Sequence, residues 1–329
     1  MRILVIGGTR FVGRAFLDAA AGRGHEVTLF HRGQSEPDGL SAAEHVHGDR
    51  DGGIEALRGR SWDSVLDTCG YVPRIVREGA ELLREAVGHY AFVSTLSVYP
   101  DENLRGANED TPMYPPPFPD TEEITAESYG PLKVSCEEAV REVFGGRSLI
   151  VRPGYIVGPN DPTDRFTFFV RRASEGGEML APGPPDAPLQ VVDVRDLGAF
   201  ILDRMEAKDP GVYGVVGPGE SASMRDVMEL SRDTAGADTS FTWVTPEFLA
   251  PLGDDVDALL PIWDVRYGVH EFDMSRAVGA GLRHRPLGET VRDLLEWDRA
   301  RGRPQLRAGL PHVKERELLQ AWHAGSAAR

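Results

Sequence analysis

A tyrosine and a lysine four positions apart, Tyr129 and Lys133, are the residues of this sequence with the clearest chemical potential. Residues at i and i+4 share one face of a helix, so the ammonium can lie next to the phenol. A phenol is a weak acid with a pKa of about 10, and a neighbouring cation favours the phenolate and lowers that pKa. Tyr129 can then pass a proton to or from a carbonyl oxygen as a general acid–base residue, while Lys133 can also hold ribose hydroxyls.

The start of the chain is typical of a phosphate-binding turn. The apolar run Ile3–Ile6 predicts a strand buried on both faces, and residues 11–17 predict a helix. Between them, Gly7 allows a tight turn and Gly13 allows close packing of the helix on the strand. Such a strand, turn and helix direct the first free N–H groups of the helix at an anion, which favours a dinucleotide pyrophosphate. The central glycine that is usual in this spacing is replaced by Arg10.

The residues after the second expected strand, 26–30, bear on the choice of dinucleotide. An acidic residue here would accept a hydrogen bond from the ribose of NAD, whereas a basic residue suits the 2′-phosphate of NADP. No acid ends this strand, and Arg32 follows it, with Arg10 in the nearby turn. Two guanidinium groups bind one phosphate strongly. The sequence therefore favours NADP, with NAD as the alternative if Arg32 is a solvated loop residue.

Further polar residues follow the next expected strands, 44–47, 64–67 and 90–93. Asp49 is either an acceptor for the adenine amino group or a turn aspartate. Residues 68–71 are expected at the carboxyl edge of the sheet, where ligands bind. The fifth strand delivers three hydroxyl side chains, any of which can orient a substrate oxygen or instead cap a turn. These are Ser94, Thr95 and Ser97.

Strands alternate with helices over the first half of the chain, which predicts an α/β fold with a doubly wound parallel sheet. Helices are expected over 76–87, 129–144, 166–175, 196–205 and 223–235. Further strands are expected over 148–151, 190–194 and 211–216, and loops over 101–128 and the proline-rich residues 178–188. We expect a dinucleotide-binding domain over 1–158, with a return at about 188–216, and a smaller substrate lobe over 159–302. Residues 303–329 are expected to form a tail or terminal helix.

The charge and composition disfavour several classes of partner. With 36 Lys and Arg against 52 Asp and Glu, the net charge is −16, which repels phosphate backbones and anionic lipids. No apolar run approaches the roughly 20 residues of a membrane span. The chain opens directly on a strand, so we expect no secretory signal. Two cysteines, Cys69 and Cys136, are too few for a disulfide framework, and a cytoplasmic location is expected.

Two histidines, His45 and His47, share one face of the third expected strand and could ligate a metal. No third ligand stands at a suitable spacing, so we interpret them as solvated strand residues and expect no metal.

Several motifs occur in the order found in a known family. They are Gly7 with Gly13, Ser94-Thr95-x-Ser97-Val98-Tyr99, Tyr129-x-x-x-Lys133, Arg152-Pro153-Gly154-x-x-x-Gly158-Pro159 and Val192-Asp193-Val194-Arg195-Asp196. In these motifs, and in Phe272–Ala277, the chain resembles the extended short-chain dehydrogenase/reductases, the NAD-dependent epimerase/dehydratase family. The resemblance covers about residues 1–300. It implies a Rossmann-type sheet with a small C-terminal substrate lobe and, by analogy, a homodimer through the helix that carries Tyr129.

The resemblance also assigns roles to residues. Aligning Val98-Tyr99 with the family's Val-Tyr-Gly places the catalytic hydroxyl on Thr95, beside Tyr129 and Lys133. Ser97, Arg165 and Arg195 are expected on the substrate, where the arginines would hold an anionic group or form structural ion pairs. The backbone of 154–156 is expected to face the nicotinamide. The full set expected at the cofactor is Gly7, Thr9, Arg10, Phe11, Val12, Gly13, Arg32, Asp49, Arg50, Thr68, Cys69, Gly70, Tyr129, Lys133, Pro153, Gly154, Tyr155 and Ile156.

Two departures from the family pattern narrow the function. The turn without its central glycine is similar to the branch that contains the chloroplast stem-loop RNA-binding proteins, although this chain keeps Tyr129 and Lys133 and is acidic. Dehydratases carry Asp-Glu after the catalytic threonine, whereas Leu96 and Ser97 follow Thr95 here, which argues against dehydration. We therefore expect an NADPH-dependent carbonyl reductase. The alternatives are an NAD-dependent sugar-nucleotide epimerase and a non-catalytic nucleotide-sensing or RNA-associated protein.

Overall fold

The computed structural model describes residues 1–34, 44–100, 104–115, 121–263 and 270–326. The chain folds as two compact units, each assembled from separate segments. The N-terminal unit comprises Met1–Gly154, Val194–Val216 and Phe272–Arg283. The C-terminal unit comprises Tyr155–Asp193, Gly217–Glu271 and His284–Arg329.

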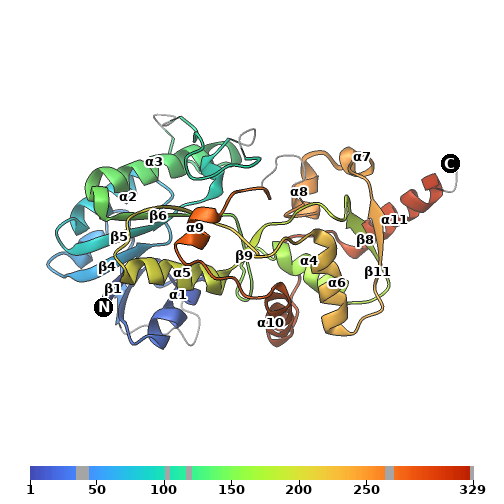
Figure 1. Cartoon of the computed structure of the whole chain (residues 1–329), viewed down its shortest axis with the longest axis horizontal. Helices are drawn as coiled ribbons and strands as arrows, with labels where there is room; N and C mark the ends of the chain where they lie inside the picture. Colours follow the sequence, from blue (N-terminus) through green and yellow to red (C-terminus); the bar gives the residue numbers. More distant parts are fainter. Residues whose placement is uncertain (35–43, 101–103, 116–120, 264–269, 327–329) are drawn as a thin grey trace. The chain divides into compact units, whose positions relative to one another are not determined.

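A sheet of seven parallel strands forms the centre of the N-terminal unit (Figure 1). Its strands are β1 (Arg2–Ile6), β2 (Glu26–His31), β3 (Glu44–His47), β4 (Trp62–Asp67), β5 (Val87–Val93), β6 (Ser148–Pro153) and β10 (Gly211–Val215). Their order is β10-β6-β5-β4-β1-β2-β3. The inner strands are buried along almost their whole length, as is usual for parallel strands with helices on both faces.

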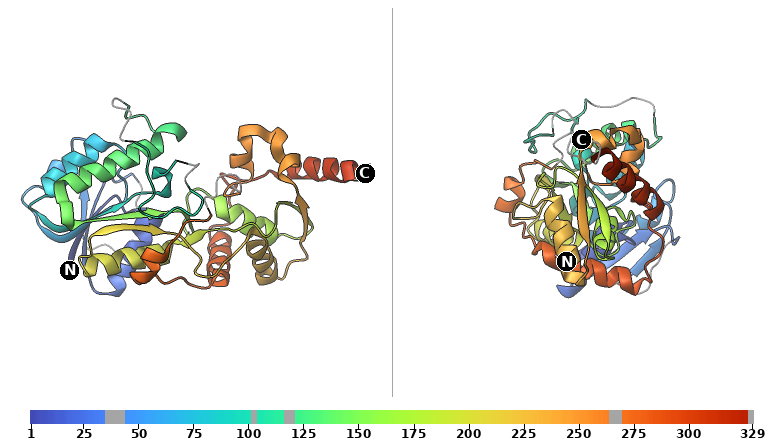
Figure 2. Two further views of the ribbon diagram at one scale, coloured as in Figure 1. Left: turned by 45° about the horizontal axis from the view of Figure 1, so that its top comes forward. Right: turned by 90° about the vertical axis from the view of Figure 1, so that its right-hand side faces the viewer.

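Helices cover both faces of this sheet (Figures 1 and 2). One face carries α2 (Pro73–Leu83) and α3 (Ala126–Phe144), and the other carries α1 (Phe11–Gly22) and α5 (Val194–Glu206). The helices α1 and α5 pack closely because α5 has a glycine at the contact: a Cβ on Gly198 would lie 3.0 Å from the backbone nitrogen of Phe16. The short helix α9 (Ser275–Gly279) completes the unit.

The strand order reverses between β1 and β4. From β1 the chain builds outward to β2 and β3, and from β4 it builds in the opposite direction to β5, β6 and β10. This confirms the expected doubly wound, Rossmann-type sheet. Ligands of such sheets bind at the carboxyl ends of the strands where the order reverses, so a ligand is expected at the ends of β1 and β4.

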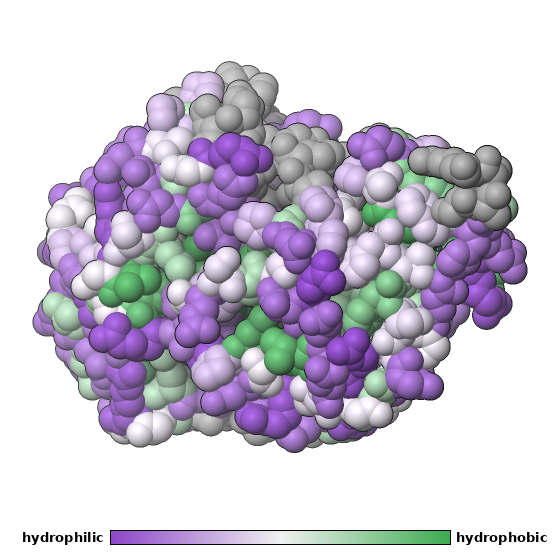
Figure 3. Space-filling view, turned by 45° about the vertical axis from the view of Figure 1, so that its right-hand side comes forward, coloured by the Kyte–Doolittle hydropathy of each residue, from purple (hydrophilic) through white to green (hydrophobic). Residues whose placement is uncertain are grey.

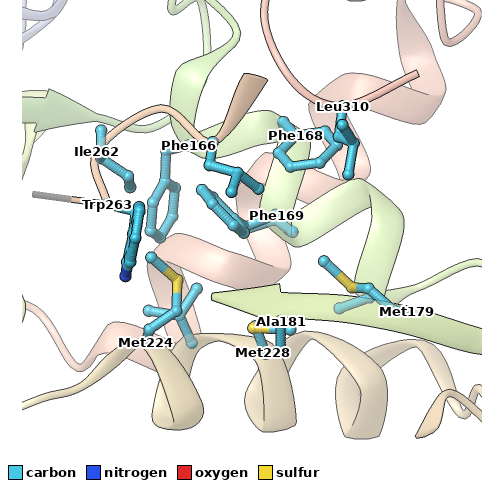
Figure 4. Close-up of a cluster of buried hydrophobic side chains, with 14 of the residues drawn as sticks. Phe166, Phe168, Phe169, Met179, Ala181, Met224, Met228, Ile262, Trp263 and Leu310 are labelled. Carbon is cyan, nitrogen blue, oxygen red and sulfur yellow. The ribbon is translucent and has the colours of Figure 1, made fainter. Parts of the chain in front are cut away.

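The C-terminal unit has its own apolar core. Its strand pairs are β7 (Tyr155–Val157) with β9 (Val191–Asp193) and β8 (Glu178–Pro182) with β11 (Ser240–Val244). Its helices are α4 (Arg165–Ala173), α6 (Met224–Ala235), α7 (Pro246–Leu249), α8 (Val256–Leu259), α10 (Leu287–Ala300) and α11 (His312–Ser326). Figure 4 shows Phe166 and Phe169 of α4 among Met224, Met228 and Trp263.

The helix α11 is an integral part of this unit. Its Glu315 is buried, accepts hydrogen bonds from Arg172 Nε (2.8 Å) and Leu180 N (3.1 Å), and so joins α4 and β8. Within the segment 303–329, expected as a tail or terminal helix, residues His312–Ser326 form this helix.

Several element boundaries differ from the sequence predictions. The expected loop 178–188 contains strand β8, because Met179–Ala181 pair with the distant β11, which the local proline content conceals. The expected helix 76–87 ends at Leu83, because Val87 already pairs with Trp62 as part of β5. The expected return at 188–216 starts at Val194 and is joined by residues 272–283. Part of the expected loop 101–128, residues 101–103 and 116–120, lies outside the described residues.

One face of the molecule is largely polar. On the face drawn in Figure 3, apolar residues form small, separate areas within a hydrophilic surface. Exposed apolar side chains scattered in this way are normal on folded proteins. Among the helices that the structure describes, none has both the length and the apolar character needed to cross a lipid bilayer.

Candidate active site

The turn after β1 requires glycine at two positions. Gly7 has a φ of +88°, and a Cβ there would lie 2.7 Å from Thr68 Oγ1. A Cβ on Gly13 would lie 2.1 Å from the Cα of Gly8, closer than any relaxation of a backbone neighbour could accommodate. The predicted tight turn is therefore confirmed, and Gly13 allows the first turn of α1 to approach the glycine backbone.

The N-terminus of α1 directly follows this turn. The helix begins at Phe11, and its N-cap residue, Arg10, makes no capping hydrogen bond with its side chain. The first main-chain bonds of the helix run from Gly13 N and Arg14 N to Arg10 O, so the amides of Phe11 and Val12 precede the helical bonding pattern. Free amides at a helix N-terminus can bind phosphates, so these two residues and Thr9 remain the ones predicted at the pyrophosphate.

The residues after β4 support the glycine turn. Thr68 Oγ1 accepts a hydrogen bond from Gly8 N (3.1 Å) and donates one to Ile6 O (3.0 Å). Cys69 Sγ lies 3.6 Å from the same carbonyl. A Cβ on Gly70 would lie 2.4 Å from the Phe92 ring. The structure thus brings Thr68 and Cys69 to the turn, whereas Gly70 packs against Phe92 of β5.

The ends of β2 and β3 carry the residues expected at the adenosine. Arg32 is exposed directly after β2. Asp49 is exposed after β3, and its Oδ1 accepts a hydrogen bond from Asp51 N (3.1 Å). That bond forms an Asx turn, which supports the turn interpretation of Asp49.

Arg50 forms a buried ion pair that the sequence does not predict. Its guanidinium donates to both carboxylate oxygens of Asp67, at 2.9 and 2.8 Å, and Tyr90 donates to the same carboxylate at 3.0 Å. Burial opposes the ionised form of Asp67, but Arg50 outweighs it and holds the pKa of that carboxyl below its usual value. Arg50 therefore anchors the end of β4 rather than presenting a free cation to a ligand.

Tyr129 and Lys133 lie in the first half of α3. A capping box between Thr125 and Ser128 fixes the start of this helix. Lys133 is 2% exposed, and its Nζ donates to Gly70 O (2.7 Å) and Val93 O (2.8 Å) above the Phe92 ring. These contacts place the ammonium at the carboxyl ends of β4 and β5. Tyr129 is half-buried one helical turn earlier.

Burial lowers the pKa of Lys133 to about 8, which predicts a pH-dependent stability. Between about pH 8 and 10.5 the unfolded chain still holds the proton that the folded lysine has released, so the free energy of unfolding rises with pH. We expect the wild type to gain about 2–3 kcal/mol relative to Lys133→Met between pH 7 and 10. Urea denaturation at several pH values measures this difference.

The control for this experiment is Lys314→Met, because the Lys314 side chain is 45% exposed. Its difference from the wild type should stay constant over the same pH range. A constant difference for Lys133→Met as well would contradict the buried, proton-releasing lysine.

Three hydroxyls follow β5. Thr95 is half-buried; its Oγ1 accepts from Ser97 N (3.1 Å) and donates to Ser97 Oγ (3.2 Å), which caps the short 3₁₀ helix Leu96–Val98. Ser97 is exposed, whereas Ser94, directly after β5, is buried. Capping leaves one lone pair on the Thr95 oxygen, which can accept a hydrogen bond from a substrate hydroxyl, whereas a bond to a carbonyl oxygen requires the Thr95 hydrogen to turn away from Ser97 Oγ.

The motif Arg152-Pro153-Gly154 serves mainly to hold the fold together. Arg152 is 1% exposed and donates to both carboxylate oxygens of Glu137 on α3, at 2.9 and 2.6 Å, and to the Tyr99 hydroxyl at 2.6 Å. Pro153 ends β6, and Gly154 N donates to Val215 O (3.2 Å). The buried pair of Arg152 and Glu137 thereby links β6 to α3, the helix that carries Tyr129.

The remaining expected residues divide between the two units. Arg195, near the start of α5, belongs to the N-terminal unit. Tyr155, Ile156 and Arg165 belong to the C-terminal unit, where the Arg165 guanidinium lies 5.1 Å from the Tyr155 ring centroid and donates to Thr163 Oγ1.

Two residues of the site were missed by sequence reasoning. Tyr71 follows β4 and lies against the site, with its ring centroid 6.4 Å from that of Tyr129 and 5.4 Å from Lys133 Nζ. Asp67 is the buried partner of Arg50. A signal existed for both, since Asp67 ends an apolar strand and Tyr71 falls within the segment expected at the ligand-binding edge.

Comparison with known proteins agrees with this geometry. The model of the NAD dependent epimerase/dehydratase family matches residues 3–216, more than half of the chain. The chain belongs to the NAD-dependent epimerase/dehydratase family. This confirms the resemblance drawn from the ordered motifs.

One curated relative is the chloroplast stem-loop binding protein of 41 kDa b of Arabidopsis thaliana. It is 26% identical over 219 residues, which cover 61% of this chain and 54% of that protein. The chain thus spans about half the length of this relative.

Solved structures of the family share the fold. The Bordetella bronchiseptica enzyme WbmH in complex with NAD+ has a TM-score of 0.70 at 17% identity, covering 92% of this chain and 99% of its own. The UDP-glucose 4-epimerase of Thermotoga maritima with UDP-glucose has a TM-score of 0.65 at 20% identity, with the same coverage. Likeness at this level of identity establishes the architecture.

Proposed function

We propose that this chain moves a hydride between a nicotinamide dinucleotide and a carbon of a sugar or other carbonyl compound, with Tyr129 as the general acid–base residue. The observation that carries the proposal is the position of Lys133. Its ammonium bonds to the carbonyls of Gly70 and Val93, at the same edge of the parallel sheet as the glycine turn after β1. Tyr129, one helical turn away, shares that face of α3.

The three side chains then have different roles. Tyr129 exchanges a proton with the substrate oxygen, and Thr95 holds that oxygen by a hydrogen bond. Lys133 favours the phenolate form of Tyr129 through its charge, and its third N–H is available for a ribose hydroxyl. When bound, the dinucleotide supplies or accepts the hydride.

The residues around the glycine turn fit a dinucleotide. Side chains at Gly7 or Gly13 would collide with their neighbours, so the backbone can approach a pyrophosphate closely at the N-terminus of α1. NAD+ is the ligand in the complex of the Bordetella relative. The exposed Arg32 after β2 favours NADP in this chain, because a guanidinium binds the 2′-phosphate.

Replacement of Arg32 tests this cofactor preference. A charge-assisted bond is worth about 1.5–3 kcal/mol, so Arg32→Asp should weaken NADPH binding about 10–100-fold and change NADH binding much less. Nicotinamide fluorescence titration measures both affinities. Arg84→Asp is the control, because the Arg84 side chain is also exposed. If Arg32→Asp weakens NADPH and NADH binding equally, Arg32 does not bind the 2′-phosphate, and NAD becomes the proposed cofactor.

For the substrate we propose a nucleotide sugar, the class bound in the Thermotoga UDP-glucose 4-epimerase structure. Removing a hydride from a sugar carbon and returning it to the other face would invert that carbon, with Tyr129 taking and returning the hydroxyl proton. The specific observation that favours net carbonyl reduction is Arg32, because a reductase draws on NADPH. Ser97, Arg165 and Arg195 are the side chains that we propose for substrate contact.

One assay separates these outcomes. The protein is incubated with UDP-glucose and NAD+ or NADP+, and NMR detects the epimer; in parallel, NADPH oxidation is followed with a panel of carbonyl compounds. Epimer formation supports the nucleotide-sugar proposal, and stoichiometric NADPH oxidation supports the reductase. Cofactor binding without turnover on either panel would contradict both.

A second candidate is an RNA-associated protein without turnover. The observations that favour it are the stem-loop binding relative and the replacement of the central glycine by Arg10. The net charge of −16 opposes it, because protein affinity for RNA depends on neutralising phosphates. Binding of stem-loop RNA at physiological salt, together with inactivity in the assay above, would favour this candidate. The homodimer expected by analogy stays a proposal.

A further inference from the structure

Three histidines meet on one face of the sheet edge formed by β2 and β3. His31 ends β2 and lies directly opposite His47 in the register of the two strands, and His45 stands two residues earlier on β3. The ring centroid of His31 lies 5.0 Å from that of His45 and 4.9 Å from that of His47. Sequence analysis identified only the pair on β3, because the third ring comes from a neighbouring strand.

We propose that these three imidazoles form a binding site for a divalent transition-metal ion of the Zn²⁺ type. One ring nitrogen from each histidine lies within 4.8 Å of the others. Nitrogen ligands of a tetrahedral Zn²⁺ lie roughly 3.4 Å apart, given Zn–N bonds of about 2.0–2.1 Å. Small side-chain rotations therefore bring the three rings into coordination.

The chemistry of the donor set selects this class of ion. Imidazole suits Zn²⁺, Cu²⁺ and Ni²⁺, whereas Mg²⁺ and Ca²⁺ require oxygen ligands. Three protein ligands leave a fourth position for water or another small ligand. Within the described parts of the chain, this is the one group of three or more His, Cys, Asp or Glu whose ligand atoms lie this close together.

Two hydrogen bonds of His31 show what the ion must replace at that ring. Gly33 N donates to His31 Nδ1 (3.2 Å), so the hydrogen of that ring is on Nε2, which lies 2.9 Å from His45 Nδ1. A metal takes the place of this hydrogen between the two rings. The hydrogen of His31 then moves to Nδ1 and the bond from Gly33 is given up, so we expect selective but moderate affinity.

The strands make the site stiff enough to bind. His31 is 6% exposed and pairs with His47 of β3, and the preceding Phe30 pairs with Ile6 of β1. His45 and His47 are exposed, so an ion can reach the rings from solvent. One buried histidine and two that solvent reaches would form a site from which the metal ion can exchange. The geometry does not depend on the function proposed above.

Cobalt titration of the full-length protein tests the proposal. Co²⁺ in a site with three imidazoles gives a visible ligand-field spectrum, and we expect it to saturate at one ion per chain and to be displaced by Zn²⁺. His45→Gln and His47→Gln should each weaken binding by about 100-fold or more, beyond what loss of a supporting hydrogen bond causes. His323→Gln removes an exposed histidine elsewhere and should change nothing.

Two results would overturn the site. One is binding that stays below one ion per chain up to millimolar Co²⁺. The other is a spectrum that survives both His45→Gln and His47→Gln. Because both substituted residues are exposed, thermal melting of each variant should match that of the wild type, and a variant with unchanged melting and lost binding supports the proposal directly.

Discussion

Replacement of Tyr129 by phenylalanine is expected to lower turnover by about 10²–10⁴-fold while leaving dinucleotide binding intact. The substitution removes only the phenol oxygen, which is the proposed proton donor and acceptor. The ring keeps its place next to Tyr71, 6.4 Å away between centroids. Rate measurements on the active substrate, with fluorescence titration of the cofactor, test both parts of this expectation.

Tyr71→Phe provides the matched control, because it removes a second phenol from the same edge of the sheet. Tyr71 belongs to the segment after β4 rather than to the helix of Lys133. The turnover of the Tyr71→Phe variant should therefore stay within a few-fold of that of the wild type. Equal losses in the two variants would show that the phenols act together. Full activity of Tyr129→Phe would contradict the mechanism.

Replacement of Glu137 by glutamine is expected to lower the free energy of unfolding by about 3–5 kcal/mol. The side chains of Glu137 and Arg152 are 0% and 1% exposed, and two hydrogen bonds join them. Glutamine fills the same space but leaves the Arg152 charge buried without its partner. Denaturant unfolding followed by circular dichroism measures the loss.

Glu142→Gln is the control on the same helix. Glu142 pairs with Arg77, but its side chain is 60% exposed, and such surface pairs contribute about 1 kcal/mol or less. The double variant Glu137→Leu with Arg152→Met should recover much of the stability, because it removes both buried charges. A similar small loss at Glu137 and Glu142 would mean that the buried pair has little role in stability.

The parts of the fold that depend on local sequence could be predicted well. The strand before Gly7, the turn and the helix after it follow from residue type and order alone. The position of Tyr129 relative to Lys133 follows from helical periodicity. Parallel strands bring their carboxyl ends to one edge, so the clustering of Gly7, Gly70 and Thr95 there could also be expected.

The features that depend on strand pairing could not be predicted in the same way. His31 joins His45 and His47 only through the register between β2 and β3. Arg50 meets Asp67 because the chain after β3 crosses to the end of β4. β8 is stabilised by β11, some sixty residues later in the chain. Such contacts are set by tertiary structure, on which a local pattern carries no information.

The segmented make-up of the N-terminal unit has a consequence for protein synthesis. The edge strand β10 pairs with β6, and Phe272 packs so tightly on it that a Cβ at Gly214 would lie 2.0 Å from the ring. The ribosome must therefore deliver the chain past residue 283 before this unit can close. Until then β10 lacks the packing of Phe272, so the unit reaches its full stability only after this late segment has been made.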